Sequence, residues 1–414
     1  MRFLAMGCQG CSLLAGAALL LLSGFHAAAT AQAQTGLTPD QQSIAESLGK
    51  SSGGQKVHFS VAPAEPIGAE VKLPFRGGTV TLVRKTSTRR SDGSISWRGE
   101  VAETGEPAAL MVWNNAPLTG YFAYDGTIFT IENTGGGVNI FAEMDPSKLP
   151  ADHPSPASSR DNLAISSQLA IPRQALSEPK VAAFADAERQ ALEAKKITID
   201  LMMLYTGNVA KRYVRDPDDL LVLAVEQTNE ILANSGLGNI TLRLVHSQRI
   251  DYDGSKDDQF THLYTMVDGL EQFKDVRKLR NEKRADIVGL VIDNPNGCGL
   301  ATRIGPDSDE AFFVVHHACA TVSMSIAHEI GHILGIRHDR HVDANDTPFA
   351  YGHGHVNGEK WRDLMSYNGG CGGCPRIAHF SNPRVMYKGE PTGTAAADSA
   401  RVILQLAERV ANFR

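Results

Sequence analysis

The sequence predicts an α/β (α+β) domain in the C-terminal half, built on a mixed twisted sheet, behind a small and mostly β N-terminal region. From residue 197 onward, short apolar runs alternate with stretches of helical periodicity, as in domains whose helices pack on a sheet. Residues 56–142 instead carry short apolar runs separated by Gly-containing turns, which is typical of an all-β region. Residues 145–196 hold six prolines and predict a linker without a packed core.

The first 33 residues predict a signal peptide. An apolar stretch of 13 residues, 13–25, is too short to span a bilayer comfortably. Small residues at 29–33 offer cleavage sites. We therefore expect a secreted protein, either extracellular or periplasmic. No later stretch predicts a membrane span, and a net charge of −6 argues against a nucleic-acid partner.

Residues 34–144 predict an N-terminal β domain. The pairs Asp92-Gly93 and Asp125-Gly126 are hairpin signals. The linker that follows, 145–196, contains one candidate helix at 182–194. A β-rich module on a loose linker suggests a propeptide, and a permanent binding domain is the alternative. Lys195-Lys196 is a candidate activation point.

Residues 197–414 predict the catalytic domain. The expected strands are 197–205, 240–244, 285–292 and 312–315. Asp216 is a candidate N-cap with Pro217 in the first helical position, and Gly236 should end that helix. Its inward side chains should be Leu220, Leu223, Ala224, Thr228, Ile231 and Leu232. Two further helices are expected over 321–334 and 395–413.

The most informative motif is His-Glu-Ile-Gly-His-Ile-Leu-Gly-Ile-Arg-His-Asp at 328–339. His328 and His332 are four residues apart, so on a helix they share one face. Gly335 can end the helix in a left-handed conformation, after which His338 can return as a third ligand. Three imidazoles with an open fourth position are typical of catalytic rather than structural zinc. The motif thus predicts one Zn²⁺ held by these three histidines.

Glu329 lies beside the first predicted ligand, where its carboxylate can reach a metal-bound water. Such a carboxylate acts as general base for amide hydrolysis. A serine or cysteine nucleophile site is not expected from this sequence.

The extended motif resembles the metzincin clan of zinc metalloendopeptidases, and Asp339 after the third histidine resembles its reprolysin (adamalysin-like) branch. The resemblance implies that Met365, 27 residues after His338, forms the methionine turn beneath the metal. It also implies that Tyr367 can contact zinc or the oxyanion. The alternative is a tyrosine that only packs against its neighbours. Asp339 is expected to be a buried carboxylate that is hydrogen-bonded to the backbone. The alternative is a solvent-exposed acid in a loop.

Segments 296–300 and 380–383 are similar to those of secreted bacterial reprolysin-like proteases, which include the peptidyl-Asp metalloendopeptidases. Such enzymes need a cation for the acidic residue after the cut, and Arg376 or Arg384 could supply it; a solvated surface arginine is the alternative for both. The five histidines that flank the motif are expected to be packing or surface residues: His316, His317, His341, His353 and His355.

The cysteines beyond the signal peptide are four in number. In an exported protein they predict two disulfides. The favoured pairing is Cys298–Cys319 with Cys371–Cys374, because 299–303 and 311–317 should form neighbouring antiparallel strands. A crossed pairing is the alternative. No cysteine lies between Gln34 and Gly297, so a propeptide thiolate cannot occupy the zinc.

Together these observations predict a secreted zinc-dependent endopeptidase made as a pre-pro-enzyme. Its partners would be protein or peptide substrates, with its own propeptide as inhibitor or folding aid. Two alternatives remain at this point. One is a catalytically degenerate binding protein, and the other is a zinc amidase acting on small or cell-wall peptides.

Overall fold

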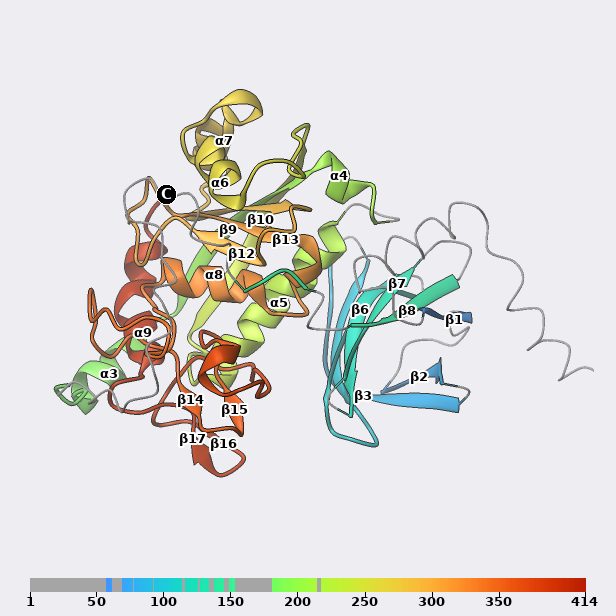
Figure 1. Cartoon of the computed structure of the whole chain (residues 1–414), viewed down its shortest axis with the longest axis horizontal. Helices are drawn as coiled ribbons and strands as arrows, with labels where there is room; N and C mark the ends of the chain where they lie inside the picture. The colour runs from blue at the N-terminus through green and yellow to red at the C-terminus, as the bar shows by residue number, and fades with distance from the viewer. Residues whose placement is uncertain are drawn as a thin grey trace, which may run out of the picture.

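A computed structural model describes residues 57–61, 69–76, 78–91, 93–113, 116–125, 127–133, 138–144, 149–152, 181–213 and 217–414. The predicted signal peptide, most of the predicted linker and the candidate cap Asp216 lie outside these residues. The described chain forms an eight-stranded sheet near its N-terminus and a five-stranded sheet with helices in the remainder. Figure 1 shows the two parts side by side, with one long helix, α5 (Asp218–Asn234), lying between their sheets.

The N-terminal sheet is antiparallel throughout and follows the order β1-β8-β7-β6-β5-β4-β3-β2. Seven of the strands therefore form a simple meander, which short hairpin loops can build. The strands are Val57–Val61 (β1), Glu70–Phe75 (β2), Gly78–Arg89 (β3), Ile95–Val101 (β4), Pro107–Trp113 (β5), Ala116–Tyr124 (β6), Thr127–Asn133 (β7) and Val138–Glu143 (β8). Gly93 has a φ of 87° between the paired residues Arg89 and Ile95, and Asp125 has a φ of 50° between the paired residues Tyr124 and Thr127.

One face of this sheet buries an apolar core rich in aromatic rings. Phe122 and Phe129 stack with centroids 5.2 Å apart, and the edge of Phe75 meets Phe129 at 4.9 Å. Trp97 and Phe141 are also fully buried. Alternate residues of β7 are buried, as expected for a half-covered strand. The sheet thus has a core of its own.

The second sheet has the order β10-β9-β11-β13-β12, parallel except for the edge strand β12. It is the mixed sheet that the sequence predicts. Its strands are Ile197–Thr206 (β9), Ile240–Ile250 (β10), Ile287–Ile292 (β11), Gly299–Ala301 (β12) and Phe312–His316 (β13). β11, at the centre, is buried at every position, which parallel strands covered on both faces require.

Helices cover both faces of this sheet. The cluster on one face includes side chains of α5, α8 and α9, and the cluster on the other includes α6 and α7. The helices are Asp186–Glu193 (α3), Gly207–Ala210 (α4), Asp218–Asn234 (α5), Gln259–Val267 (α6), Val276–Lys283 (α7), Ser325–Ile333 (α8) and Ser399–Val410 (α9). Two small hairpins complete the lower part: Val356–Asn357 (β14) with Trp361–Arg362 (β15), and Met386–Tyr387 (β16) with Glu390–Pro391 (β17).

Several helix boundaries differ from the sequence expectation. The structure makes Pro217 the N-cap residue of α5 rather than its first helical residue. α8 starts at Ser325 rather than at residue 321, because Met324 takes a left-handed φ of 57° and breaks the helical path. The end of α5 agrees with the expectation, since Gly236 has a φ of 79°.

The α5 helix packs against both sheets. Val222 and Leu223 of α5 pack against Met111 and Tyr121 of the N-terminal sheet. The hydroxyl of Tyr121 accepts a hydrogen bond of 2.9 Å from Gln227, and Arg98 of β4 forms an ion pair with Glu230 of α5. The α5 helix is consequently buried on the side facing each sheet. No described helix is both long and apolar enough to cross a membrane.

Candidate active site

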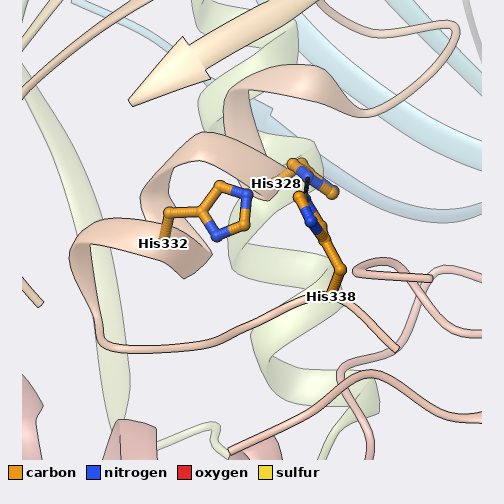
Figure 2. A group of neighbouring side chains, drawn as sticks. All are labelled: His328, His332 and His338. Atoms are coloured by element: carbon orange, nitrogen blue, oxygen red, sulfur yellow. Dashed lines mark hydrogen bonds between the residues drawn. The ribbon is translucent and has the colours of Figure 1, made fainter. Parts of the chain in front are cut away.

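The helix α8 and the bend after it bring three histidines together. Their ligand nitrogens all lie within 4.8 Å of one another, and the side chains are buried. Figure 2 shows His328 and His332 reaching out from the helix toward His338, which comes from the segment after the bend. Gly335 makes that bend with a φ of 92°, and a Cβ there would meet Leu406 at 2.8 Å. Both its backbone angle and its surroundings require glycine.

Backbone carbonyls fix the orientation of two of these rings. His328 donates from Nδ1 to Leu364 O at 3.0 Å, and His332 donates from Nδ1 to Ile336 O at 2.8 Å. Because each Nδ1 carries the proton, each Nε2 presents a lone pair suited to a metal ion. The Nε2 atoms of His328 and His338 are 3.2 Å apart. Three neutral imidazoles with converging nitrogens fit a divalent transition metal.

Glu329 lies beside the histidines and is 1% exposed. Neither carboxylate oxygen has a hydrogen-bond partner of good geometry among the described residues. Burial raises the pKa of Glu329 well above its ordinary value, and the charge of Asp152 adds to this, while the backbone N–H of Ala301 and the charge of Arg376 oppose it. A carboxyl in such surroundings is suited to take up and release a proton.

The carboxylate of Glu329 rests on the edge strand β12. A Cβ built on Gly299 would lie 2.3 Å from Glu329 Oε1, so only glycine admits the carboxylate at this position. The sequence motif did not reveal this contact. Its only trace in the sequence is a glycine beside a cysteine in segment 296–300.

The methionine turn lies directly against α8. Met365 is fully buried, and a Cβ on Gly331 would meet its sulfur at 2.7 Å. The neighbouring Leu364 supplies the carbonyl that orients His328. Asp363 shapes the turn by accepting hydrogen bonds from the Met365 N–H at 3.1 Å and the Ser366 hydroxyl at 2.6 Å.

Asp363 was not singled out from sequence. Its second oxygen accepts from Ser381 N–H at 3.0 Å, so it also ties the turn to the C-terminal part of the chain. Burial raises its pKa to about 7. The signal that could have pointed to it is its place two residues before Met365.

Asp339 and Tyr367 connect the turn to the third histidine. The carboxylate of Asp339, 2% exposed, accepts from the backbone N–H of His341 at 3.0 Å and of Tyr367 at 2.8 Å. Burial raises the pKa of Asp339 to about 6. The ring of Tyr367 lies 4.3 Å from that of His338, centroid to centroid. The structure therefore brings both residues to the histidine cluster.

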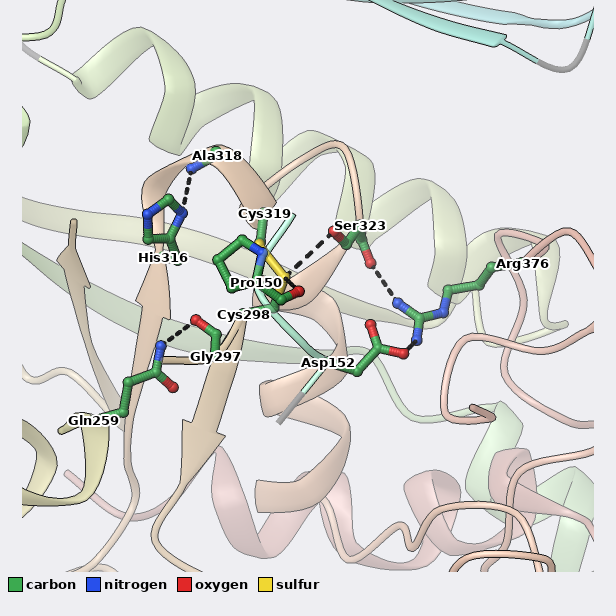
Figure 3. The surroundings of a disulfide bond; sticks show 10 residues. All are labelled: Pro150, Asp152, Gln259, Gly297, Cys298, His316, Ala318, Cys319, Ser323 and Arg376. Carbon is green, nitrogen blue, oxygen red and sulfur yellow. Dashed lines mark hydrogen bonds and ion pairs between the residues drawn. A yellow bond between two sulfur atoms is a disulfide. The ribbon is translucent and has the colours of Figure 1, made fainter. Parts of the chain in front are cut away.

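Two disulfides flank the site. Cys298, just before β12, is joined to Cys319 in the segment before α8, and Cys371 is joined to Cys374. The Cys298–Cys319 disulfide therefore links the edge strand β12 to the segment that leads into α8. Figure 3 shows this disulfide beside Ser323, Arg376 and Asp152.

The flanking histidines form no second cluster. Among the residues the structure describes, the group at 328, 332 and 338 is the only set of metal-capable side chains of this kind. His317 contacts the Tyr213 hydroxyl at 3.0 Å, and His353 bonds to His338 O at 2.8 Å. Burial lowers the pKa of His316 to about 4. His317 and His353 thus hold neighbouring groups of the fold in place through these contacts.

The two arginines that the sequence offered as candidate cations, Arg376 and Arg384, lie in different surroundings. Arg384 forms a bidentate ion pair with Asp398 at 2.7 and 2.8 Å, where Asp398 caps α9. Arg384 thus has a structural role at the start of α9. Arg376 lies beside the metal site, where it pairs with Asp152 at 2.9 Å.

The convergence of three buried imidazoles with a buried glutamate defines a metal-dependent hydrolase. The model for metallo-peptidase family M12 matches residues 195–381. A peptidyl-Asp metalloendopeptidase of Xanthomonas campestris pv. campestris is 30% identical over 371 residues, covering 86% of this chain and 84% of that protein. One from Stenotrophomonas maltophilia is 29% identical over 384 residues, covering 86% and 85%.

The chain therefore belongs to metallopeptidase family M12, and it is a metalloendopeptidase that acts on proteins or peptides. This confirms the resemblance to metzincin metalloendopeptidases. A solved structure of metalloproteinase-II from Bacteroides fragilis covers 88% of this chain and 95% of its own, with 13% identity and a TM-score of 0.42. That likeness is too weak to support a statement about the fold.

Proposed function

We propose that this metalloendopeptidase uses one zinc ion, held by His328, His332 and His338, with Glu329 as general base. The observation that carries the proposal is the convergence of three Nε2-presenting imidazoles beside a buried carboxylate. Three nitrogen ligands with room for a fourth are the usual set for catalytic zinc.

A bound zinc ion would acidify a water molecule and polarise the substrate carbonyl. Glu329 then accepts the water proton on its carboxylate and delivers it to the leaving amine nitrogen. Its burial supports this role because the carboxyl can hold the proton between the two steps. Gly299 keeps the carboxylate at its place, and the Leu364 and Ile336 carbonyls keep two imidazoles in the metal-binding tautomer.

The supporting residues have assigned parts in this proposal. Met365 provides an apolar floor against α8, and Asp339 links the third histidine to the turn. Tyr367 is a candidate for stabilising the oxyanion because its ring packs on His338.

We also propose export and synthesis as a precursor. The signal-like residues 1–33 support export. The N-terminal sheet has its own core and joins the catalytic part through α5 and residues 149–152, which is consistent with a propeptide. Because both relatives are peptidyl-Asp metalloendopeptidases, we propose that the peptide bond cut is one that involves an aspartate.

The metal part of the proposal is tested on the purified secreted protein with a protein substrate such as casein. Hydrolysis should stop with a zinc chelator and return on adding zinc. His332→Ala should lose both bound metal and hydrolysis, since a two-ligand site binds zinc weakly. Full activity of metal-free protein would contradict the proposal, as would an inactive wild type with zinc bound, which would favour a binding protein.

A further inference from the structure

We propose that Arg376 is the residue that selects an acidic substrate side chain, and that Asp152 of the same chain occupies this site as a substrate mimic. The inference rests on the proposed function and names the group responsible for the aspartate preference. It begins from one ion pair, Asp152 Oδ2 to Arg376 Nη2 at 2.9 Å.

Arg376 lies between the two segments that build the metal site. Its Nη1 donates to Ser323 O at 2.9 Å, just before α8, and its Nη2 lies 3.4 Å from Ser366 O, just after Met365. Figure 3 shows the guanidinium directed at both Ser323 and Asp152. A side chain held by these two segments is placed at a fixed distance from the catalytic groups.

The guanidinium is buried without an acidic partner from the catalytic part. The Arg376 side chain is 8% exposed, and Asp152 is its only ion-pair partner among the described residues. Its remaining contacts are backbone carbonyls, and its Nε has no hydrogen-bond partner in the described chain. A buried cation of this kind has a strong preference for a carboxylate, which it can bind through two N–H groups.

A second cation strengthens the preference. Arg362 lies close enough to Arg376 for the two charges to interact, and its own hydrogen bonds go to the carbonyls of Ser366 and Cys374. The carboxylates of Asp339 and Asp363 also act on the Arg362 charge, but both already accept hydrogen bonds from backbone N–H groups. Arg376 has no ion-pair partner other than Asp152 in the described chain, so its charge is the one that an incoming anion would balance. Without Asp152, the position beside Arg376 would favour an incoming acidic side chain.

The segment that carries Asp152 lies along the site as a peptide would. The N–H of Cys298, immediately before the edge strand β12, donates to Ala151 O at 2.7 Å. β12 is also the strand on which Glu329 rests. The segment therefore places one backbone carbonyl on the sheet edge and one carboxylate on Arg376. Extended peptides bind to sheet edges by this combination of backbone and side-chain contacts.

Asp152 is 27% exposed and comes from outside the catalytic part, whereas Arg376 is nearly buried. Asp152 can therefore leave the ion pair together with the N-terminal part of the chain, whereas Arg376 stays buried in the catalytic part. The intact chain should be held back by its own acid, and an acidic substrate should compete for the same cation.

The test uses the intact chain and two fluorogenic peptides that differ only in Asp against Asn after the cut. For the wild type we expect a preference for the Asp peptide in kcat/KM. Arg376→Gln should reduce the Asp/Asn ratio of kcat/KM about tenfold or more, with zinc content retained, because a charged contact to the acidic side chain is lost. The ratio cancels any change in the reactivity of Glu329, since that change acts on both peptides alike. Arg376→Lys should restore only part of the ratio, since lysine keeps the charge without the bidentate geometry.

Asp152→Asn should raise kcat/KM for the Asp peptide about tenfold in the intact chain. The matched control is Glu230→Gln, which removes a carboxylate from another ion pair between the same two parts of the molecule, that of Arg98 with Glu230. It should leave the kinetics unchanged. If both Arg376 variants fail to fold, the Asp152→Asn comparison decides.

Two outcomes overturn the inference. One is an Asp/Asn ratio that Arg376→Gln leaves unchanged. The other is an intact chain whose rate is the same with Asp152→Asn or rises equally with Glu230→Gln. If the zinc-loaded wild type cuts neither peptide nor casein, the proposed function fails instead, so the two failures are distinguishable.

Discussion

The interior of the N-terminal sheet and the interior of the catalytic part differ in their charge. Among the fully buried described residues of β2–β8 there is no Asp, Glu, Lys, Arg or His. The catalytic part buries many such groups, including Asp219, Arg280, Asp286, Glu329, Asp339, Asp343, Asp363 and Asp398. Both parts have well-packed apolar clusters, so stability alone does not explain the difference.

Buried charge is costly, and it persists where it is bonded or used. Arg280 shows the bonded case, because its guanidinium donates to the carbonyls of Ala285, Asp286 and Ser308. Glu329 shows the other case, with no well-aligned partner in the described chain. The contrast shows that the catalytic part keeps a buried acid, Glu329, without a well-aligned hydrogen-bond partner in the described chain, whereas the interior of the N-terminal sheet is apolar.

The largest expected effect removes an aromatic ring from the N-terminal core. Phe122 is fully buried against Phe75, Phe129 and Phe141. Phe122→Ala should destabilise this sheet by about 3–5 kcal/mol. Calorimetry should show an early transition for the sheet and an unchanged transition for the catalytic part. A single transition that moves as a whole would show instead that α5 couples the two parts into one unit.

The second-largest expected effect comes from displacing the carboxylate of Glu329. Gly299→Ala places a methyl group where the Glu329 carboxylate rests, at 2.3 Å. The rate of hydrolysis should fall about 10²-fold, since small displacements of catalytic groups cost that much, while zinc content stays constant. Gly238→Ala is the matched control, because a Cβ there meets nothing within 4 Å. Equal rates for both variants would place the general base elsewhere.

The smallest effect concerns one acid of the N-terminal sheet. Partly buried Glu132 lies near Asp219 of α5, and burial raises its pKa from 4.5 to about 8. The unfolded chain ionises this group near pH 4.5 and the folded chain only near pH 8. Folded stability is therefore lost as pH rises through this window and is level above it.

Glu132→Gln removes that pH dependence. The Tm of the variant should exceed that of the wild type by about 2–4 °C at pH 9, and the two should agree at pH 4. The exposed Glu103→Gln serves as control. A gain that is the same at both pH values would show that the carboxyl is not held neutral in the folded chain.

The metal site could be predicted because its signal is local. The spacing of His328 and His332, the bend at Gly335 and the return of His338 all lie within one short segment, where helical geometry fixes the outcome. The approximate places of the strands and helices followed from periodicity for the same reason. The start of α8 was missed because the left-handed backbone at Met324 has no sequence signature.

The remaining site residues depend on contacts between distant segments. Gly299 meets Glu329 across 30 positions, Asp363 meets Ser381 through the fold, and Asp152 reaches Arg376 from the predicted linker. No periodicity or short motif encodes such contacts. They depend on the tertiary arrangement, which one sequence does not reveal.

The most direct test of the account is the zinc content and the hydrolysis rate of Glu329→Gln, measured on the same preparation. Zinc should remain at about one ion per chain because the three histidines are untouched. Hydrolysis of casein should fall at least 10²-fold because the proton acceptor is gone. A variant that binds zinc and cleaves casein at the wild-type rate would contradict the account.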